Sequence, residues 1–234
     1  MNLSEEFFFK GYTTFSLKDS PVKEKFLAAT SAAHDGDFDQ EKFSWKTKYH
    51  GTEDFRESVF DYNPSFIDIL FDNNIPNLIN EATNDRRVTL SHVQLRRSYP
   101  GNSYMDWHRD NHIKNGKQVG PFPPCAKIIF YPFREREDCL RVIPGSHIRF
   151  FESKKQDAEV NSNFPSKTIK GSNDHVTFFD TSIWHGAING SNPKGSLRLI
   201  YGFSSKSQHL TNFSDKPVHE RINSYYEQRL KEKS

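Results

Sequence analysis

Cysteine and long apolar runs are both scarce in this chain. Its 234 residues include 2 Cys, Cys125 and Cys139. They are too few for a disulfide framework and are not spaced as a zinc-binding pair, so we expect two free thiols in a reducing cytoplasm. No stretch approaches the about 18 apolar residues of a membrane-spanning helix, and the opening residues lack the features of a secretory signal. We therefore expect no membrane partner.

An excess of charge of one sign is also missing. The chain has 32 Lys and Arg against 30 Asp and Glu, and its formal net charge is +2 at pH 7. A surface that binds nucleic acid usually carries a basic stripe. The local basic pair Arg96 and Arg97 is too small for that, so we expect no nucleic-acid partner.

Aromatic residues, by contrast, are abundant. The 21 Phe and 9 Tyr offer large surfaces for a core, although the hydrophobic fraction is only 34%. The length suits one domain that spans residues 1–234, and no composition shift marks a second one.

The N-terminal part, to about residue 86, is predicted to be largely helical. We expect a short helix at 4–10, a strand at 11–17 and a helix at 21–33. Apolar residues recur near the helical period over 64–82, where Pro76 is expected to kink or split the helix.

From about residue 87 to 205 the chain has the texture of strands. Apolar and β-branched runs bounded by Gly, Pro, Asn or Asp predict strands within 87–97, 126–133, 140–145, 175–180, 181–188 and 196–205. A further helix is predicted at about 216–232, where the basic last turn complements the helix dipole. Helices followed by strands indicate an α+β domain whose sheets form a sandwich or jelly roll.

The stretch "WHRDNH" at 107–112 allows three interpretations. On a helix, His108 and His112 would share a face as zinc ligands do, but the preceding turn "YPGNS" and Asn111 disfavour a helix. On a strand, His108 and Asp110 would share a face while Arg109 points away. The third interpretation is a surface histidine followed by a capping aspartate.

Downstream residues bear on that choice. His185, in "SIWHGAI", offers a third ligand, and two histidines with one carboxylate are typical of non-haem Fe(II) oxygenases. After the turn-forming "NGSNPKG", Arg198 lies in an alternating strand, so the chain can reverse and bring it beside His185. A buried guanidinium needs an anionic partner, and its fork fits a carboxylate.

These motifs together resemble the phytanoyl-CoA dioxygenase-like branch of the Fe(II)/2-oxoglutarate oxygenases. The resemblance is carried by "WHRD", "LRVIPGSH" at 140–147, "DHVTFFD" before His185 and "RLIYGF" with Arg198, and by the opening "EEFFFKGYTTF". It spans roughly residues 4–203. Arg109 stands where the family often has glutamine, which we expect to affect substrate choice.

The resemblance implies a double-stranded β-helix core (jelly-roll, cupin-like) with the N-terminal helices packed outside. It implies that His108, Asp110 and His185 hold Fe(II), that 2-oxoglutarate chelates the iron while Arg198 binds its far carboxylate, and that O2 is consumed. Halogenating relatives lack the carboxylate, so Asp110 favours hydroxylation, although desaturation or ring closure uses the same ligands. The expected substrate is a small molecule, free or carried by a larger partner.

Weaker candidates surround this site. Trp107 is a candidate wall of the cosubstrate pocket, and Arg97 would face the pocket if its strand points Val93, Leu95 and Arg97 inward. Tyr131 and Lys127 share a face of "AKIIFYPF", where a lysine between apolar neighbours is unusual.

Three expectations concern the surroundings and the function as a whole. His147 is expected to sit in a structural turn, and residues 99–125 to form a lid over the substrate. Two other functions stay open: a non-catalytic metal- or ligand-binding protein on the same scaffold, and a zinc hydrolase.

Overall fold

The secondary structure comes from a computed structural model, which describes residues 2–17, 24, 25, 27, 28, 30, 31, 46–48, 52–55, 59–72, 74–84, 88–100, 105–110, 113, 114, 117, 118, 126–131, 139–149, 151, 153–188, 196–205 and 216–233. The helices are α1 (Leu3–Lys10), α3 (Val59–Tyr62), α4 (Ser65–Asp72), α5 (Ile75–Ala82), the 3₁₀ turn η1 (Ser146–Ile148), α6 (Lys154–Asn161) and α7 (Lys216–Lys233). The strands are β1 (Tyr12–Ser16), β2 (Lys46–Lys48), β3 (Thr52–Phe55), β4 (Val88–Ser98), β5 (Met105–His108), β6 (Ile113–Lys114), β7 (Lys117–Gln118), β8 (Ala126–Phe130), β9 (Cys139–Val142), β10 (Lys167–Lys170), β11 (His175–Asp180), β12 (His185–Ile188) and β13 (Ser196–Ser205).

Local sequence accounts for the ends of the first helix. The Asn2 side chain accepts a hydrogen bond from the Glu5 backbone N–H at 2.8 Å, and the Glu5 carboxylate accepts one from the Asn2 N–H in return. Gly11 ends α1 in the left-handed conformation, with φ 79°, and its N–H bonds to the Phe7 carbonyl. The predicted helix at 4–10 and the strand after it are confirmed.

The predicted break at Pro76 is also confirmed. The segment 64–82 forms two helices, α4 and α5, and Pro76 occupies the first turn of α5. A proline is tolerated there because the N–H it lacks would have no partner within the helix. Asn74, at φ 56°, makes the left-handed connection between the two helices.

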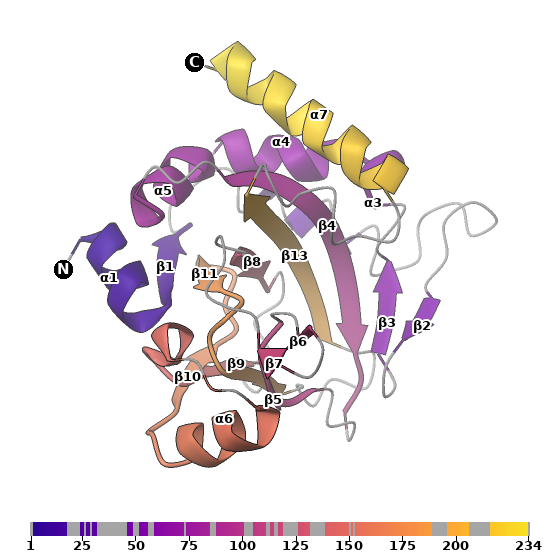
Figure 1. Ribbon diagram of the computed structural model, residues 1–234. Helices are drawn as coiled ribbons and strands as arrows, with labels where there is room; N and C mark the ends of the chain where they lie inside the picture. The colour runs from indigo at the N-terminus through magenta and orange to yellow at the C-terminus, as the bar shows by residue number, and fades with distance from the viewer. Residues whose placement is uncertain are drawn as a thin grey trace.

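The larger sheet has seven strands in the order β1-β11-β8-β13-β4-β3-β2, and neighbouring strands run antiparallel. Helices α4, α5 and α7 lie on one side of this sheet, with α7 running across the end of β4 (Figure 1). The core on this side contains Leu199, Tyr201 and Phe203 of β13 together with Phe66 and Leu70 of α4. The hydroxyl of Tyr201 donates to the Phe66 carbonyl at 2.5 Å.

A second sheet has four strands, in the order β10-β9-β12-β5. A smaller apolar cluster joins the two sheets. It combines Ile129, Phe179 and Ile200 of the larger sheet with Leu140 and Val142 of the smaller one. Strand β13 therefore has two covered faces, since alternate residues contact the helices on one side and the inter-sheet cluster on the other.

The structure is thus a mixed fold of helices and antiparallel sheets, which confirms the α+β class. The predicted strands between 87 and 205 and the C-terminal helix are present. Helices α3 and α6 and strands β2, β3, β6, β7 and β10 were not predicted, and β2 and β3 lie in the N-terminal part that we expected to be largely helical. Within the part of the chain that the structure describes, no helix is both long and apolar enough to cross a membrane.

Several expectations fall on residues outside this description. The predicted helix at 21–33 lies largely outside the described residues, as does most of the predicted lid at 99–125. Cys125 and His112 are not described either. The division into one domain over 1–234 stays a prediction.

Candidate metal centre

The first two candidate ligands meet because their strands are neighbours. Strands β5 and β12 pair antiparallel in a register that sets His185 opposite His108. Side chains of directly opposed residues project from the same face of a sheet. The two imidazole rings accordingly lie with their centroids 4.3 Å apart. Two residues far apart in sequence thus form one side of a compact site.

Asp110 completes the cluster from just beyond the end of β5. Its backbone N–H donates to the Thr181 carbonyl at 3.0 Å, which ties this residue to the chain that leads into β12. The carboxylate Oδ1 lies 3.4 Å from Nε2 of His108, and Oδ2 lies 3.8 Å from Nε2 of His185. One ligand atom from each residue lies within 4.8 Å of the others.

The protonation of His185 suits a metal ligand. Its Nδ1 lies 2.8 Å from the Ile183 carbonyl, so Nδ1 carries the proton and donates it to that oxygen. Nε2 is then left with a lone pair directed at the cluster. Burial, opposed in part by the charge of Asp110, lowers the pKa of His185 to about 4, so the ring is neutral at pH 7.

Asp110 is a carboxylate under the same conditions. Burial by itself raises the pKa of this carboxyl, but the charge of Lys127, the hydrogen bond with His108 and the nearby imidazoles outweigh it and hold the pKa well below its usual range. The Lys127 Nζ lies 2.6 Å from Asp110 Oδ2.

Two imidazoles and one carboxylate on one side of a point are the donors of the facial triad that binds Fe(II) in non-haem oxygenases. The residues present therefore fit the predicted metal. The first alternative, His108 with His112 on a helix, loses its geometric basis because His108 ends the strand β5.

Arg198 is buried, with 2% of its surface exposed. It follows Leu197 and precedes Leu199, which both face the helices, so it lies on the inter-sheet side of β13 together with Ile200. Its guanidinium carbon lies 6.0 Å from the ring centroid of Tyr131, which is 3% exposed. Arg198 and Tyr131 thus lie between the two sheets. Lys127, which contacts the candidate ligand Asp110, lies on the same side, because it shares a face of β8 with Ile129.

Two of the sequence candidates lie elsewhere. Val93, Leu95 and Arg97 share a face, as expected, but Val93 and Leu95 belong to the core on the helix side of the larger sheet. Arg97 is paired with Leu197 on that side, so this register does not support Arg97 as a pocket residue. The arginine paired with Arg198 is its neighbour Arg96.

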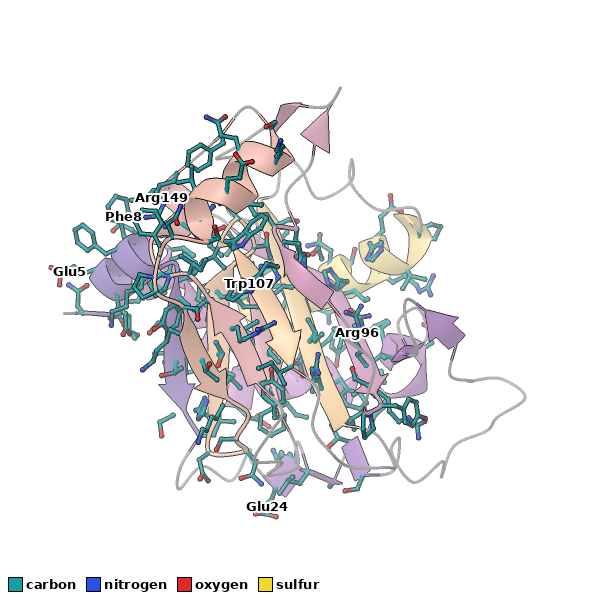
Figure 2. All side chains as sticks on the ribbon, turned by 90° about the horizontal axis from the view of Figure 1, so that it is seen from below. Glu5, Phe8, Glu24, Arg96, Trp107 and Arg149 are labelled. Atoms are coloured by element: carbon teal, nitrogen blue, oxygen red, sulfur yellow. The ribbon has the colours of Figure 1, made fainter. Side chains whose placement is uncertain are left out.

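Trp107 does not face the cluster either. It precedes His108 in β5 and so projects to the opposite face of the smaller sheet. There the guanidinium of Arg141 lies 4.9 Å from its ring centroid. Figure 2 shows Trp107 and Arg96 in separate parts of the molecule. The geometry does not support Trp107 as a wall of the cosubstrate pocket.

Arg109 has a structural role that its position between two ligands did not reveal. Its guanidinium makes two hydrogen bonds to Asp157 of α6, at 2.7 and 2.8 Å, and both side chains are only 3% exposed. It also donates to the carbonyls of Ser146, Arg149 and Ser182. The structure gives no support to the expectation that Arg109 affects substrate choice, because its N–H groups donate to groups within the protein.

The turn that follows β9, residues 143–147, supports the segment that carries His185. The Ser146 hydroxyl accepts a hydrogen bond from the Trp184 N–H at 2.7 Å, one residue before His185. The His147 ring lies 2.8 Å from the Phe8 carbonyl, so this histidine fastens the turn to the end of α1. His147 is structural, as predicted.

A fold of two facing antiparallel sheets with a two-histidine, one-carboxylate cluster defines the class of the non-haem metal oxygenases. A family model described as "Phytanoyl-CoA dioxygenase (PhyH)" matches residues 20–195. The chain therefore belongs to the phytanoyl-CoA dioxygenase family, which confirms the predicted family and the predicted class of 2-oxoglutarate-dependent non-haem iron dioxygenases.

Solved structures share the fold at low sequence identity. HygX from Streptomyces hygroscopicus, with nickel, 2-oxoglutarate and hygromycin B bound, is 16% identical with a TM-score of 0.63, over 86% of this chain and 85% of its own. The carbocyclase SnoK from nogalamycin biosynthesis is 13% identical with a TM-score of 0.68, over 92% and 90%. EctD from S. alaskensis, with bound Fe, is 16% identical with a TM-score of 0.64, over 92% and 78%. No curated protein matches the sequence.

Proposed function

We propose that this protein is an Fe(II)/2-oxoglutarate-dependent dioxygenase that hydroxylates a small molecule and releases succinate and CO2. The observation that carries the proposal is the meeting of His108, Asp110 and His185 within 4.8 Å of one another. Its support is the family to which the chain belongs and a buried arginine, Arg198, on the same interior.

The scaffold that we propose is a double-stranded β-helix. Strands β4, β13, β8 and β11 lie side by side in the larger sheet, and β5, β12, β9 and β10 in the smaller one. The chain thus changes sheet after β4, returns at β8, crosses again at β9, returns at β11, crosses a third time at β12 and returns at β13, which is the winding of a jelly roll. In this scaffold the ligands lie between the two sheets, where His185 is buried while His108 and Asp110 stay partly exposed.

In the proposed mechanism, His108 and His185 would each hold the iron through a ring nitrogen and Asp110 would hold it through a carboxylate oxygen. The neutral state of His185 and the ionised state of Asp110 mean that neither loses a proton when metal binds at pH 7. The bound iron supplies the activation of O2, with 2-oxoglutarate as the reductant. The protein contributes the arrangement of three ligands on one side, which leaves the other side open.

Arg198 is proposed to bind the far carboxylate of 2-oxoglutarate. The guanidinium lies in the protein interior with 2% exposure, on the inter-sheet side of β13, and the fork of Arg fits a carboxylate with two parallel hydrogen bonds. Tyr131, beside the guanidinium, is proposed to line the same pocket.

A small-molecule substrate is supported by the solved relatives. HygX was solved with hygromycin B, and the epimerase SnoN with nogalamycin RO. The presence of Asp110 supports hydroxylation, because halogenating relatives lack this carboxylate. A cytoplasmic site of action, suited to an Fe(II) enzyme with two cysteines, is part of the same proposal.

The test is turnover that depends on the ligand set. Purified protein is incubated in air with Fe(II), 2-oxoglutarate and a library of small molecules, and succinate is measured. We expect succinate release that the His185→Ala variant abolishes and that the variant His175→Ala, on β11, retains. If the protein binds iron but releases no succinate, either with the library or through uncoupled turnover of 2-oxoglutarate without substrate, the result would favour a non-catalytic binding protein. Retention of zinc and not iron after anaerobic purification would favour the hydrolase.

A further inference from the structure

Lys127 stands out among the residues of the larger sheet. It lies in β8 between Ala126 and Ile128, which are 1% and 0% exposed, and opposite Phe179 of the inter-sheet cluster. Lysine is rarely placed among such neighbours unless its charge is paired. Here its Nζ lies 2.6 Å from Oδ2 of Asp110, a predicted metal ligand.

Because of this contact, the two carboxylate oxygens of Asp110 have different partners. Oδ2 is occupied by the ammonium group, whereas Oδ1 lies 3.4 Å from Nε2 of His108. A cation held between the imidazoles therefore finds Oδ1 free of the lysine. Hydrogen bonds to the second oxygen of a ligating carboxylate fix its orientation and are part of how proteins tune a metal site.

The charge of Lys127 acts in the opposite direction on cations and on anions. An ammonium group within hydrogen-bond distance of the ligating carboxylate repels a divalent metal at the same carboxylate. It attracts any anion that reaches the metal, and 2-oxoglutarate is a dianion. With 26% of the Lys127 side chain exposed, solvent screens this interaction only in part.

We propose that Lys127 is a positioning residue that holds Asp110 through Oδ2 and supplies the positive charge by which the centre favours an anionic ligand at the metal. This inference rests on the proposed function, because it assumes that Asp110 binds the metal and that 2-oxoglutarate binds beside it. It assigns to Lys127 a role in cosubstrate affinity that is separate from that of Arg198.

Three substitutions separate the hydrogen bond from the charge. Lys127→Arg keeps both, Lys127→Gln keeps a donor without the charge, and Lys127→Met keeps neither. Affinity for Ni2+ is measured by calorimetry, and affinity of the Ni2+-loaded protein for 2-oxoglutarate by the same method. Neither measurement requires turnover. Lys10→Gln, which removes the exposed ion pair of Lys10 with Glu6 on α1, is the matched control.

We expect Lys127→Gln to bind 2-oxoglutarate about tenfold more weakly while it binds Ni2+ as tightly as the unmodified protein or more tightly. Lys127→Met loses the same affinity for 2-oxoglutarate and binds Ni2+ more weakly than Lys127→Gln, because Asp110 is no longer held. Lys127→Arg and Lys10→Gln match the unmodified protein. If the substitutions at Lys127 acted only through lost packing, the affinities for Ni2+ and for 2-oxoglutarate would fall together.

Two results would overturn the inference. In the first, the unmodified protein binds Ni2+ and 2-oxoglutarate, but Lys127→Gln binds 2-oxoglutarate equally well; the proposed function then survives and the role of Lys127 does not. In the second, the unmodified protein binds neither ligand; both proposals then fail, and the contact with Asp110 is an ordinary ion pair. Lys127→Arg and Lys127→Gln keep the hydrogen bond, so they provide the test if Lys127→Met does not fold.

Discussion

Replacement of Arg109 by methionine should destabilise this protein more than the same replacement of an exposed arginine would. Arg109 lies between His108 and Asp110 but points away from them. Its guanidinium contacts Asp157 through two hydrogen bonds and three backbone carbonyls through others. Both side chains of the ion pair are 3% exposed. Methionine fills a similar volume but leaves the Asp157 carboxylate buried without its cation.

The size of the effect follows from that burial. Removal of one partner from a buried ion pair costs about 3–5 kcal/mol, because the other charge is left uncompensated. Domains are stable by only about 5–15 kcal/mol. In a chain of this length each kcal/mol corresponds to a change of roughly 2–4 °C in Tm, so the variant should melt about 6–20 °C lower.

The loss should also reach the metal centre. Three successive carbonyls organise it: Thr181 accepts from the Asp110 N–H, Ser182 from Arg109, and Ile183 from the His185 ring. Without Arg109 the two ligand-bearing segments are joined by fewer contacts. We therefore expect Ni2+ to bind at least about tenfold more weakly even at temperatures where the variant is folded.

Thermal unfolding by circular dichroism and calorimetric Ni2+ titration measure these two effects. The control is Arg221→Met, since Arg221 pairs with Asp61 at 2.9 Å while 49% and 42% of the two side chains are exposed. It should cost less than about 1 kcal/mol. A second variant, Arg109→Met with Asp157→Leu, should regain part of the lost stability because no buried charge remains. If Arg109→Met has the same Tm as Arg221→Met, the buried ion pair does not stabilise the fold and the reasoning is refuted.

Three further predictions follow from single residues. Arg198→Ala should weaken 2-oxoglutarate binding by the metal-loaded protein at least about tenfold, whereas Arg97→Ala, on the other face of the sheet, should not; equal losses in calorimetry would contradict the pocket assignment. Gly11→Ala should lower the free energy of unfolding by at least about 1 kcal/mol in urea titrations, because φ is 79° and a Cβ would lie 2.6 Å from Nδ1 of His147; unchanged stability would exclude this strain. The metal-free protein should lose stability as pH falls from about 6.5 to about 4, since unfolded His185 gains a proton that the folded ring excludes; this residue should contribute about 3 kcal/mol more stability above pH 6.5 than below pH 4, and the stability of His185→Gln should depend less steeply on pH over the same range.

Much of the local structure was readable from the sequence because short-range signals determine it. Pro76 broke the helical period where α4 ends and α5 begins, and Gly11 ended α1. Alternation in "SLRLIYGFSS" predicted β13. Helix α6 was missed although Ser153 caps it, since the helix has little apolar surface and so no periodicity. Strand β10 is short and mostly exposed, and it too lacked a pattern.

The candidate ligands were readable for a different reason. The spacing of His108 and Asp110 was weak evidence by itself. Together with His185, Arg198 and the motifs between them, it carried the family resemblance. Arg198 was identified because it lies in an alternating strand, where a buried guanidinium would require an anionic partner. The role of these residues stays a proposal, but the structure brings the three candidates together, as the sequence analysis expected.

The faces of the strands could not be read from the sequence. Residues 88–95 of β4 are all buried, so neither face of this part of the strand meets water. Hydrophobic alternation distinguishes the two faces of a strand only when one of them meets water. The sequence could therefore state that Val93, Leu95 and Arg97 share a face, but not which face looks toward the metal centre.

The sequence by itself determined most of the helices and core strands, the candidate ligand types and the family, because each depends on residues close in the chain or on a motif. Tertiary structure alone decided which charges meet. Lys127 of the larger sheet contacts Asp110, which follows a strand of the smaller sheet. Arg109 contacts Asp157 of α6, which lies 48 residues later in the sequence. Such pairings depend on the register and crossing of strands, and no local pattern encodes the distance between two charged groups.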